Sequence, residues 1–457
     1  MLYPLSYRRL PFGGFYYTHA LSQRKIESQD CLTMHNMANP VVPARGMRDI
    51  LPSEKEKRDQ ILSTIADVYL RAGFLPIETP AVEPLSRLTS GQGGENEKML
   101  FQIMKRGLPA DGTVAVRDAA DLGLRYDLTV PLTRYYASNI ADLPRVFRAF
   151  QSGPVWRAER PQKGRYRQFI QCDIDILGDE SITAEVDLVV TTLSALTALG
   201  LGDQVKVLVN DRRFLIGILA AAGIGDDNVD AALIALDKAD KIGLGGVRAE
   251  LVDKGIADAQ SADRLLALVA SLQDEQVCET ALKDGHVVVG DREVSLQDLP
   301  AIVAAVRELI PQARIEFDPT LVRGMGYYTG AIFEVKHKER DYSIAGGGRY
   351  DKVVGKWLGR DVPACGFSIG FERIVDLVAD TETQGKKVAL LYKPGGSPVD
   401  LLRLRQELLD QGASVSLVVP PRRPNSQFFD GLAEQGYTHS LDARREASAA
   451  DLRELSF

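Results

Sequence analysis

Residues 157–175, RAERPQKGRYRQFIQCDID, constrain what this chain can fold into and bind more than any other segment. The first eleven positions hold five cations and one acid, and Gln171, Asp173 and Asp175 follow at alternate positions. Guanidinium groups fixed in a loop bind phosphate well, and alternate polar residues share one face of a strand, where they can hold an ammonium group. The pattern predicts a strand, a basic loop and a second strand over residues 146–177, at a site where ATP meets an amino acid.

The composition is that of a globular protein with two or three domains. The chain has 457 residues and a net charge of −7, which argues against unspecific binding of a polyanion but leaves room for a local basic patch. Its four cysteines are scattered without a C-x-x-C pair, so we expect neither a metal site nor a disulfide framework. The sequence has no apolar run near the ~20 residues that span a bilayer. We therefore expect a cytoplasmic protein without a membrane partner.

Residues 1–40 differ in composition from the rest of the chain. Through Ile26 they hold four basic residues and no acid, which leaves an organellar presequence open. We favour an extension that is disordered or spurious, with Met34 or Met37 as the working start and the folded protein beginning near Val41.

Helical and extended patterns follow one another along the rest of the chain. Ser53 and Glu56 form a capping box before a helical repeat that Gly73 ends. Residues 187–200 and most of 211–310 are helical by pattern. Short strands are predicted at residues 332–335, 342–344 and 364–369, and the last is followed by a helix from residue 372.

The end of the chain has a different pattern. After a polar linker at residues 380–387, strands and helices alternate. Strands are predicted at residues 388–392, 414–419 and 437–441, and helices at residues 398–411 and 426–436. This order is typical of a small parallel α/β domain.

Two further arginines lie beside glycines, which let a backbone approach a ligand closely. Arg373 follows the strand GFSIG and stands in the first turn of a helix, where a cation opposes the helix dipole, so its place makes sense beside a triphosphate. Arg323 precedes GMGYYTG, and AGGGRYD at residues 345–351 is interpreted as a second glycine-rich loop beside the same pocket. Solvated surface arginines are the ordinary alternative, and an isolated Gly-Gly-Gly is usually a flexible turn.

Residues that suit an amino-acid ligand are also present. Asp127 and Thr129 stand at alternate positions and could join Gln171 and Asp175 around an α-ammonium group. A helix cap is the ordinary alternative for such a pair. The tyrosine hydroxyls at residues 327–328 could recognise a polar ring.

Together these segments resemble the histidyl-tRNA synthetase family of class II aminoacyl-tRNA synthetases, from RGMRDILP at residues 45–52 to about Val378. Three segments are similar to the class II motifs, and two are similar to segments specific to the histidine enzymes. The first three lie at residues 73–84, 146–175 and 364–374, and the other two at residues 323–330 and 345–351.

The resemblance implies an α+β fold. A class II antiparallel-sheet catalytic domain would be flanked by helices, carry a helical insertion and precede a small C-terminal α/β domain. The catalytic domain would span residues 41–205 and 313–380, with the inserted helical module at residues 206–312. A shortened anticodon-binding-like domain would span residues 386–457, after the extension at residues 1–40.

The resemblance also implies a two-step reaction: ATP-dependent activation of L-histidine to histidyl-adenylate, then transfer to the 3′ end of tRNA-His, by a homodimer that uses Mg²⁺. Arg157 and Arg323 would be catalytic, with Arg323 at the α-phosphate. The ATP-binding residues would be Arg157, Glu159, Phe169 and Arg373. The histidine-binding residues would be Asp127, Thr129, Gln171, Asp175, Tyr327 and Tyr328. The residues near the tRNA acceptor end would be Arg160 and Gln162.

The chain departs from the family pattern at two places. Met325-Gly326 replaces a Leu-Asp-like pair, and the C-terminal domain is short, which leaves its anticodon contacts undefined. The alternative function is that of a non-catalytic, histidine-binding regulatory paralog that acts with ATP phosphoribosyltransferase. Such paralogs usually lose the catalytic arginines and the C-terminal domain, whereas this chain keeps Arg157, Arg323, Arg373 and an α/β tail.

Overall fold

The computed structural model describes residues 41–89, 99–108, 114–115, 118–161, 164–323, 327–340, 342–379, 385–445 and 447–455. The chain divides into two units, Met1–Pro43 and Ala44–Phe457, and the elements below belong to the second. The predicted extension at residues 1–40 lies outside the described residues, as do Gln162 and Met325-Gly326. None of the described helices combines the length and apolarity needed to cross a bilayer.

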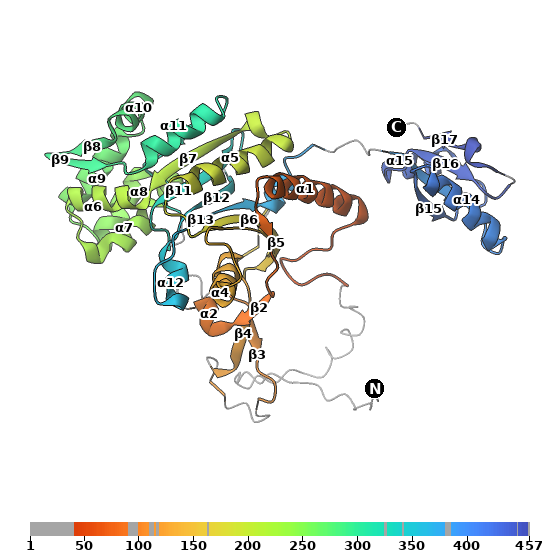
Figure 1. The fold of residues 1–457 in the computed structure, drawn as a ribbon, viewed down its shortest axis with the longest axis horizontal. Coiled ribbons are helices and arrows are strands. Elements are labelled where there is room, and N and C mark those ends of the chain that lie inside the picture. Colours follow the sequence, from red (N-terminus) through yellow and green to blue (C-terminus); the bar gives the residue numbers. More distant parts are fainter. Residues whose placement is uncertain are drawn as a thin grey trace, which may run out of the picture. The chain divides into compact units, whose positions relative to one another are not determined.

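The main element of the second unit is a large, mostly antiparallel sheet (Figure 1). Within the described residues it has eight strands in the order β1–β5–β6–β13–β12–β11–β7–β10. Their bounds are Leu75–Pro76 (β1), Phe147–Trp156 (β5), Gln168–Leu177 (β6), Ala364–Gly370 (β13), Ser343–Arg349 (β12), Ala331–His337 (β11), Val205–Asp211 (β7) and Ile315–Phe317 (β10). Neighbours from β5 to β7 pair antiparallel, whereas the edge strands β1 and β10 pair in parallel. The predicted fold class is confirmed.

β5 and β6 form the predicted hairpin, in register from Phe147 opposite Leu177 to Trp156 opposite Gln168. Apolar and polar side chains alternate along β6, and Ile174 is fully buried in the core. Because successive side chains of a strand point to opposite faces, the acids between the isoleucines share the other face. The hairpin therefore presents a row of polar groups from the middle of the sheet.

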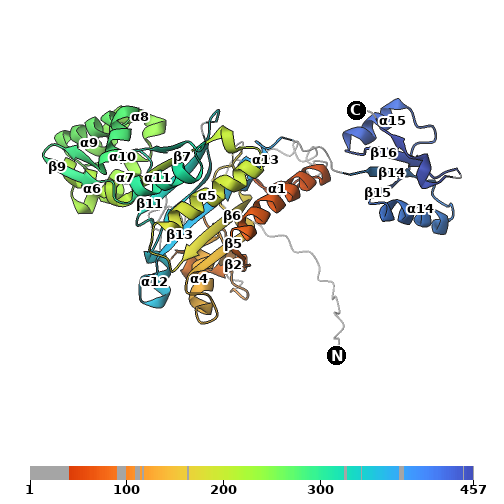
Figure 2. The same cartoon turned by 45° about the horizontal axis from the view of Figure 1, so that its top comes forward.

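Helices cover one face of this sheet. α1 (Pro52–Arg71), α5 (Thr183–Ala198) and α13 (Phe371–Val375) lie side by side over β6 and β13 (Figure 2). Ile65 of α1 and Leu188 of α5 are fully buried in the shared core. The helix expected from residue 187 begins earlier, at Thr183.

The two ends of α1 gave different outcomes. The predicted capping box is wrong, because Pro52 starts the helix, Leu51 is the N-cap residue, and no side chain caps it. The predicted stop is confirmed: Gly73 has a φ of +85°, and its N–H donates to the Leu70 carbonyl at 3.0 Å. The N–H of Phe74 reaches back to the end of the helix as well, which is the Schellman arrangement.

Helices fill the chain between β7 and β10, as the pattern predicted. They are α6 (Arg212–Ala222), α7 (Val229–Leu236), α8 (Ala239–Asp253), α9 (Ala259–Ser271), α10 (Glu275–Asp284) and α11 (Leu299–Leu309). A hairpin of β8 (His286–Val289) and β9 (Arg292–Ser295) was not predicted. Phe214 and Phe317 pack edge to face at 5.3 Å, so the helices share the core of the sheet. Because Val205–Asp211 is a strand of that sheet, the helices begin only at Arg212.

A second, small sheet lies beside the β5–β6 hairpin, where the Trp156 backbone N–H donates to the Arg125 carbonyl. It consists of β2 (Val82–Pro84), β4 (Ala120–Leu124) and β3 (Gln102–Met104), and its neighbouring helices are α2 (Leu85–Thr89), α4 (Thr129–Asn139) and α12 (Lys352–Leu358). α4 is the helix predicted to run through Tyr136, and it packs against α12.

The C-terminal α/β arrangement is also as predicted. Its elements are β14 (Lys387–Leu391), α14 (Pro398–Asp410), β15 (Ser414–Val418), α15 (Ser426–Glu434), β16 (His439–Asp442) and β17 (Arg453–Glu454). β15, β14 and β16 pair in parallel, and β17 adds an antiparallel edge that was not predicted. The exact domain boundaries stay a prediction.

Candidate active site

Arg157 lies at the end of β5, where the hairpin opens into the basic loop. Its Nε donates to the Tyr126 carbonyl at 3.0 Å, and its guanidinium carbon lies 5.1 Å from the centre of the Phe169 ring. The backbone N–H of Arg157 donates to the Arg167 carbonyl at 2.8 Å, which closes the loop. One backbone bond and one aromatic face therefore hold this guanidinium beside an exposed basic loop.

Arg373 enters from the other side, in the first turn of α13. Its guanidinium donates to the Ser343 carbonyl and lies 5.3 Å from the centre of the Tyr342 ring. Burial lowers the pKa of Arg373, and the nearby positive charges of Arg165 and Arg323 lower it further. An anion bound between these cations would offset their repulsion, as Glu334 does in part.

Three buried carboxyl groups lie close together next to Arg157, and we call their surroundings the pocket. Burial raises the pKa of Asp127 to about 6, against hydrogen bonding from the backbone and the charge of Arg157. Burial also raises the pKa of Asp175 to about 7, although the Tyr350 hydroxyl donates to this carboxylate at 2.6 Å. For Asp173, burial and the charge of Asp175 raise the pKa well above the usual range. Buried carboxylates this close together favour a bound cation.

Two acceptors in this pocket lack a hydrogen-bond partner among the residues that the structure describes. Asp127 accepts from the Val130 N–H through Oδ1 at 3.1 Å, but its buried Oδ2 has no partner. Gln171 donates to the Ser368 hydroxyl at 2.9 Å, but its buried Oε1 has no partner. An unmet buried acceptor costs stability, so this pair suits a ligand that donates hydrogen bonds, such as an ammonium group.

Tyrosines connect the carboxylates to the arginines. The rings of Tyr327 and Tyr328 lie 4.8 Å apart, and Tyr350 packs against Tyr327 at 5.8 Å. Burial raises the pKa of Tyr327, and Tyr328 and Asp127 raise it further. Burial also raises the pKa of Tyr328, against the charge of Arg323 and a hydrogen bond with it. The two hydroxyls thus lie between an acidic and a basic group.

Residues 345–349 belong to a strand, β12 (Ser343–Arg349), so the prediction of a glycine-rich loop is wrong for these residues. Its glycines make room for side chains of the pocket. A Cβ at Gly346 would lie 2.5 Å from Nη1 of Arg323, and one at Gly348 would lie 2.9 Å from the Tyr328 ring. On β13, a Cβ at Gly366 would lie 1.9 Å from a carboxylate oxygen of Asp175. A larger residue at any of these positions would force its neighbours to shift.

A family model described as histidyl-tRNA synthetase matches residues 46–374. The chain belongs to this family. It is 45% identical to the histidine--tRNA ligase of Leifsonia xyli subsp. xyli, over 434 residues that cover 92% of this chain and all (100%) of that protein. It is 44% identical to the probable histidine--tRNA ligase of Tropheryma whipplei strain Twist, over 402 residues that cover 85% of this chain and 92% of that protein. A crystal structure of histidyl-tRNA synthetase from Nostoc sp. PCC 7120 matches with a TM-score of 0.68 and 26% identity, over 91% of this chain and 95% of that one.

Most of the residues that the synthetase family pattern singled out come together here. Pairwise interactions connect them: Asp127 interacts with Arg157, Asp175 and Tyr327, Tyr328 interacts with Tyr327 and Arg323, and Arg323 interacts with Arg373. Thr129 is the first residue of α4, next to Tyr327, with which it forms a hydrogen bond. Glu159 accepts from Arg165 at 2.7 Å in the loop, and Arg160 is exposed on that loop.

Three side chains of the synthetase pocket were not assigned from the sequence. Asp173 belongs to the alternation of polar residues noted in the sequence, but it was not included among the predicted histidine-binding residues. Tyr350 lies in the AGGGRYD segment that was expected beside this pocket, but the tyrosine itself was given no role. Glu334 was not singled out, and the pairing of β11, β12 and β13 brings the two residues to Arg323 and Asp175.

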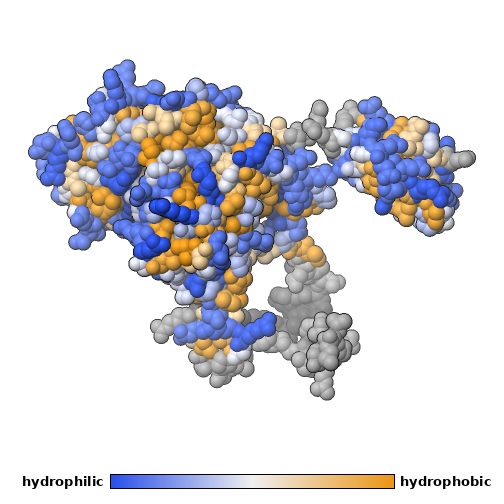
Figure 3. Space-filling view, in the orientation of Figure 1, coloured by the Kyte–Doolittle hydropathy of each residue, from blue (hydrophilic) through white to orange (hydrophobic). Residues whose placement is uncertain are grey.

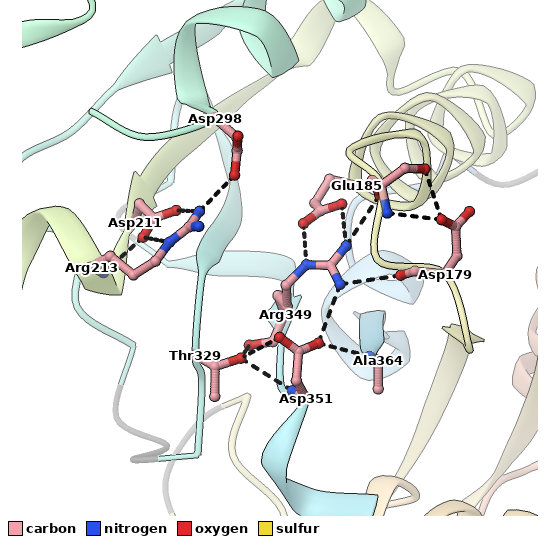
Figure 4. Close-up of polar contacts among 10 residues, drawn as sticks. Asp179, Glu185, Asp211, Arg213, Asp298, Thr329, Arg349, Asp351 and Ala364 are labelled. Carbon is pink, nitrogen blue, oxygen red and sulfur yellow. Dashed lines mark hydrogen bonds and ion pairs between the residues drawn. The ribbon is translucent and has the colours of Figure 1, made fainter. Parts of the chain in front are cut away.

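A buried polar network contacts Thr329, the residue that follows Tyr327 and Tyr328 in the chain (Figure 4). Arg349 donates to both carboxylate oxygens of Glu185 on α5, at 2.6 and 2.7 Å. Its carbonyl accepts from the N–H of Thr329, the residue after the tyrosines, at 2.8 Å. Asp351 accepts from the Thr329 hydroxyl at 3.1 Å. The network therefore fixes where the tyrosine segment joins the sheet.

Proposed function

We propose that this chain activates L-histidine with ATP, forming histidyl-adenylate and pyrophosphate, and then transfers the histidyl group to the 3′ end of tRNA-His. Membership of the histidyl-tRNA synthetase family supports this reaction. The observation that carries the assignment to this pocket is the pair of buried, unpartnered acceptors, Asp127 Oδ2 and Gln171 Oε1, next to a group of arginines. An α-ammonium group satisfies the acceptors, and a polyphosphate satisfies the cations.

In the first step a carboxylate oxygen of histidine attacks the α-phosphorus of ATP in line. An O–P bond forms, the bond to the β-phosphate oxygen breaks, and pyrophosphate leaves with the electron pair. Arg157 and Arg323 stabilise the charge that builds on the α-phosphoryl oxygens, while Phe169 stacks on adenine and Arg373 binds the outer phosphates. Glu159 contributes to ATP binding from the loop. Positioning and charge account for the catalysis, since the step needs no proton transfer.

Recognition of histidine divides between two ends of the pocket. Asp127, Gln171 and Asp175 hold the α-ammonium group, and Tyr327 and Tyr328 recognise the neutral imidazole. Thr129 supports Tyr327 through the hydrogen bond between them. A ligand without the imidazole N–H and N acceptor leaves buried hydroxyls unpaired, which disfavours other amino acids.

Magnesium enters this proposal with the nucleotide. The described residues contain no group of three or more His, Cys, Asp or Glu side chains that could hold a metal ion. Mg²⁺ is commonly bound through substrate phosphates and water, where it neutralises charge. We therefore assign no residue of this chain as its ligand.

The remaining features are proposed as follows. The chain works as a homodimer in the cytoplasm, with the domain boundaries given above. The face shown in Figure 3 has apolar patches beside hydrophilic ones. Exposed apolar side chains of α1, of β1 and of the small sheet β2–β4–β3 support a partner surface. They are Leu70, Leu75, Val82, Met104 and Leu122. The described cysteines, Cys172, Cys278 and Cys365, are free, which suits a reducing compartment.

Two assays on the purified chain test the proposed function. Histidine-dependent exchange of labelled pyrophosphate into ATP reports the first step, and charging of tRNA-His reports the second. We expect both, with histidine alone of the twenty amino acids supporting exchange. Histidine binding without exchange would instead favour the regulatory paralog, and exchange with another amino acid would contradict the specificity.

Arg160→Ala is expected to lower kcat/KM for charging by about 10-fold and to leave exchange within about 2-fold. Arg160 is exposed on the basic loop, away from the buried carboxylates, so it suits the acceptor end of tRNA, with Gln162 beside it in sequence. Arg71→Ala removes another exposed arginine, on α1, and serves as the control for lost surface charge. Equal loss in both assays would contradict an acceptor-end role.

Tyr350→Phe is expected to shift the acid limb of kcat/KM for histidine to a pH about one unit higher. Burial raises the pKa of Asp175 to about 7, and the hydrogen bond from Tyr350 restrains that rise. Without the hydroxyl the pKa of Asp175 rises further. As the pH falls, the carboxylate that binds the ammonium group is therefore protonated at a higher pH than in the wild type. The exchange assay measures this from pH 5.5 to 9, and titration of the substrate imidazole is common to both enzymes. Identical profiles would show that Asp175 does not limit binding.

A further inference from the structure

Arg323 has an unfavourable backbone conformation. Its φ of +59° is one of two left-handed values among the described non-glycine residues, the other belonging to Gln297. An L-residue adopts this region only when its surroundings hold it there, because Cβ clashes with the backbone. The side chain of Arg323 must therefore be fixed by contacts that offset this cost.

One such contact comes from β11, in addition to the hydrogen bond with Tyr328 described above. Nη1 of Arg323 donates to Oε2 of Glu334 at 3.0 Å. Glu334 lies directly opposite Gly346 in the pairing of β11 with β12, so the two positions share one face of the sheet. Since Gly346 has no side chain, the guanidinium occupies the space beside the Glu334 carboxylate.

The Glu334 carboxylate also interacts with a second cation, Lys336, which in turn pairs with Asp240 of α8. Nζ of Lys336 lies 3.6 Å from Oε1 of Glu334 and donates to Oδ2 of Asp240 at 3.1 Å. Asp240 stands in the first turn of α8, before the break in that helix at Gly243, whose φ is +68°. A continuous line of charges therefore runs from α8 through Lys336 and Glu334 to Arg323.

We propose that Glu334 is the positioning residue for Arg323, and that Lys336 holds Glu334 in place from Asp240 of α8. This inference rests on the proposed function, because it gives Arg323 its task at the α-phosphate. Glu334 touches no substrate and acts through the direction of the guanidinium. The first turn of α8 therefore helps set the rate of adenylate formation.

The test compares kcat with KM in histidine-dependent pyrophosphate exchange. Glu334→Ala is expected to lower kcat about 10²-fold, because a misplaced catalytic group costs about that much, while KM for histidine and for ATP stays within about 3-fold. Glu334→Gln keeps an acceptor for the guanidinium and is expected to stay within about 10-fold of the wild type. Lys336→Met is expected to lower kcat about 5-fold, since Glu334 keeps one partner.

Glu316→Ala is the matched control. Glu316 lies on β10 of the same sheet and pairs with Lys206 at 2.9 Å, but it does not contact Arg323. Its loss is expected to change kcat less than 2-fold. A wild-type kcat in Glu334→Ala would overturn the positioning role, and a wild-type kcat in Lys336→Met would overturn the link to α8. The double variant gives a further check. If Glu334→Ala lowers kcat by the same factor in the Arg323→Lys background as in the wild type, the two residues act independently, and the positioning role would be overturned.

A crystal structure of the Glu334→Ala chain gives a reading that does not depend on activity. We expect the Arg323 side chain to leave its place over Gly346, and an unmoved guanidinium would overturn the proposal. If the wild-type chain shows no exchange, the proposed function fails, and this structure still decides whether Glu334 positions Arg323.

Discussion

Replacing Arg323 by alanine is expected to lower histidine-dependent pyrophosphate exchange by about 10³-fold while the Kd for histidine changes less than about 3-fold. The guanidinium donates to Glu334 and lies near the charge of Arg373, whereas the cation that acts on Asp127 is Arg157. We therefore expect Arg323 to reach the phosphate and not the ammonium group. Exchange and calorimetric titration with histidine measure the two effects separately.

Two variants make this result specific. Arg323→Lys keeps a positive charge but loses the planar fork, so we expect an exchange rate between those of the wild type and the alanine variant. Arg307→Ala breaks a bidentate pair with Glu279 on the surface, at 2.6 and 3.0 Å, and is expected to leave exchange unchanged. A normal exchange rate in Arg323→Ala would remove this residue from the mechanism.

The two strands of the β5–β6 hairpin could be predicted from local pattern alone, whereas the large antiparallel sheet was expected from the family resemblance and its strands β7 and β10 were not predicted. Alternation of apolar and polar residues in QFIQCDID, next to the apolar run before Arg157, is a strong strand signal, and both strands were found. The alternating strands and helices after residue 385 were predicted for the same reason. In these segments burial of one face determines the structure, and burial leaves its period in the sequence.

The glycine-rich segment at residues 345–351 shows where local pattern fails. Three consecutive glycines predict a turn, but here they form a strand whose missing side chains are replaced by side chains from elsewhere. Gly346 receives Arg323 and Gly348 receives Tyr328, and neither neighbour is close in sequence. A strand built to accommodate distant groups carries no period that reveals it.

The partners of the predicted residues were hidden for the same reason. Glu334 and Tyr350 are ordinary strand and strand-end residues until β11, β12 and β13 pair. Ser53 failed differently, because Pro52 can start a helix without a side-chain cap. Sequence reasoning therefore singled out, by their chemistry, residues that are proposed to touch ligands, and it gave no role to Glu334 and Tyr350, which contact other side chains.

Replacing Asp127 by asparagine is expected to raise KM for histidine by about 10²-fold and to leave KM for ATP unchanged. Oδ2 of Asp127 is buried without a partner, while Oδ1 already accepts from Val130. The asparagine amide offers the ligand either a neutral acceptor or a donor that repels an ammonium group. Because burial raises the pKa of Asp127 to about 6, the comparison is made at pH 8, where the wild-type carboxylate is charged.

Imidazole lactate, the α-hydroxy analogue of histidine, separates ammonium binding from a general disturbance of the pocket. It keeps the imidazole and the carboxylate but has no positive charge for Asp127 to attract. We expect its Kd to differ less than about 3-fold between the wild type and Asp127→Asn, since the tyrosines that recognise the ring are unchanged. If the analogue loses as much affinity as histidine, Asp127 maintains the shape of the pocket through its bond to Val130. The ammonium group would then have to be held by Gln171 and Asp175 alone.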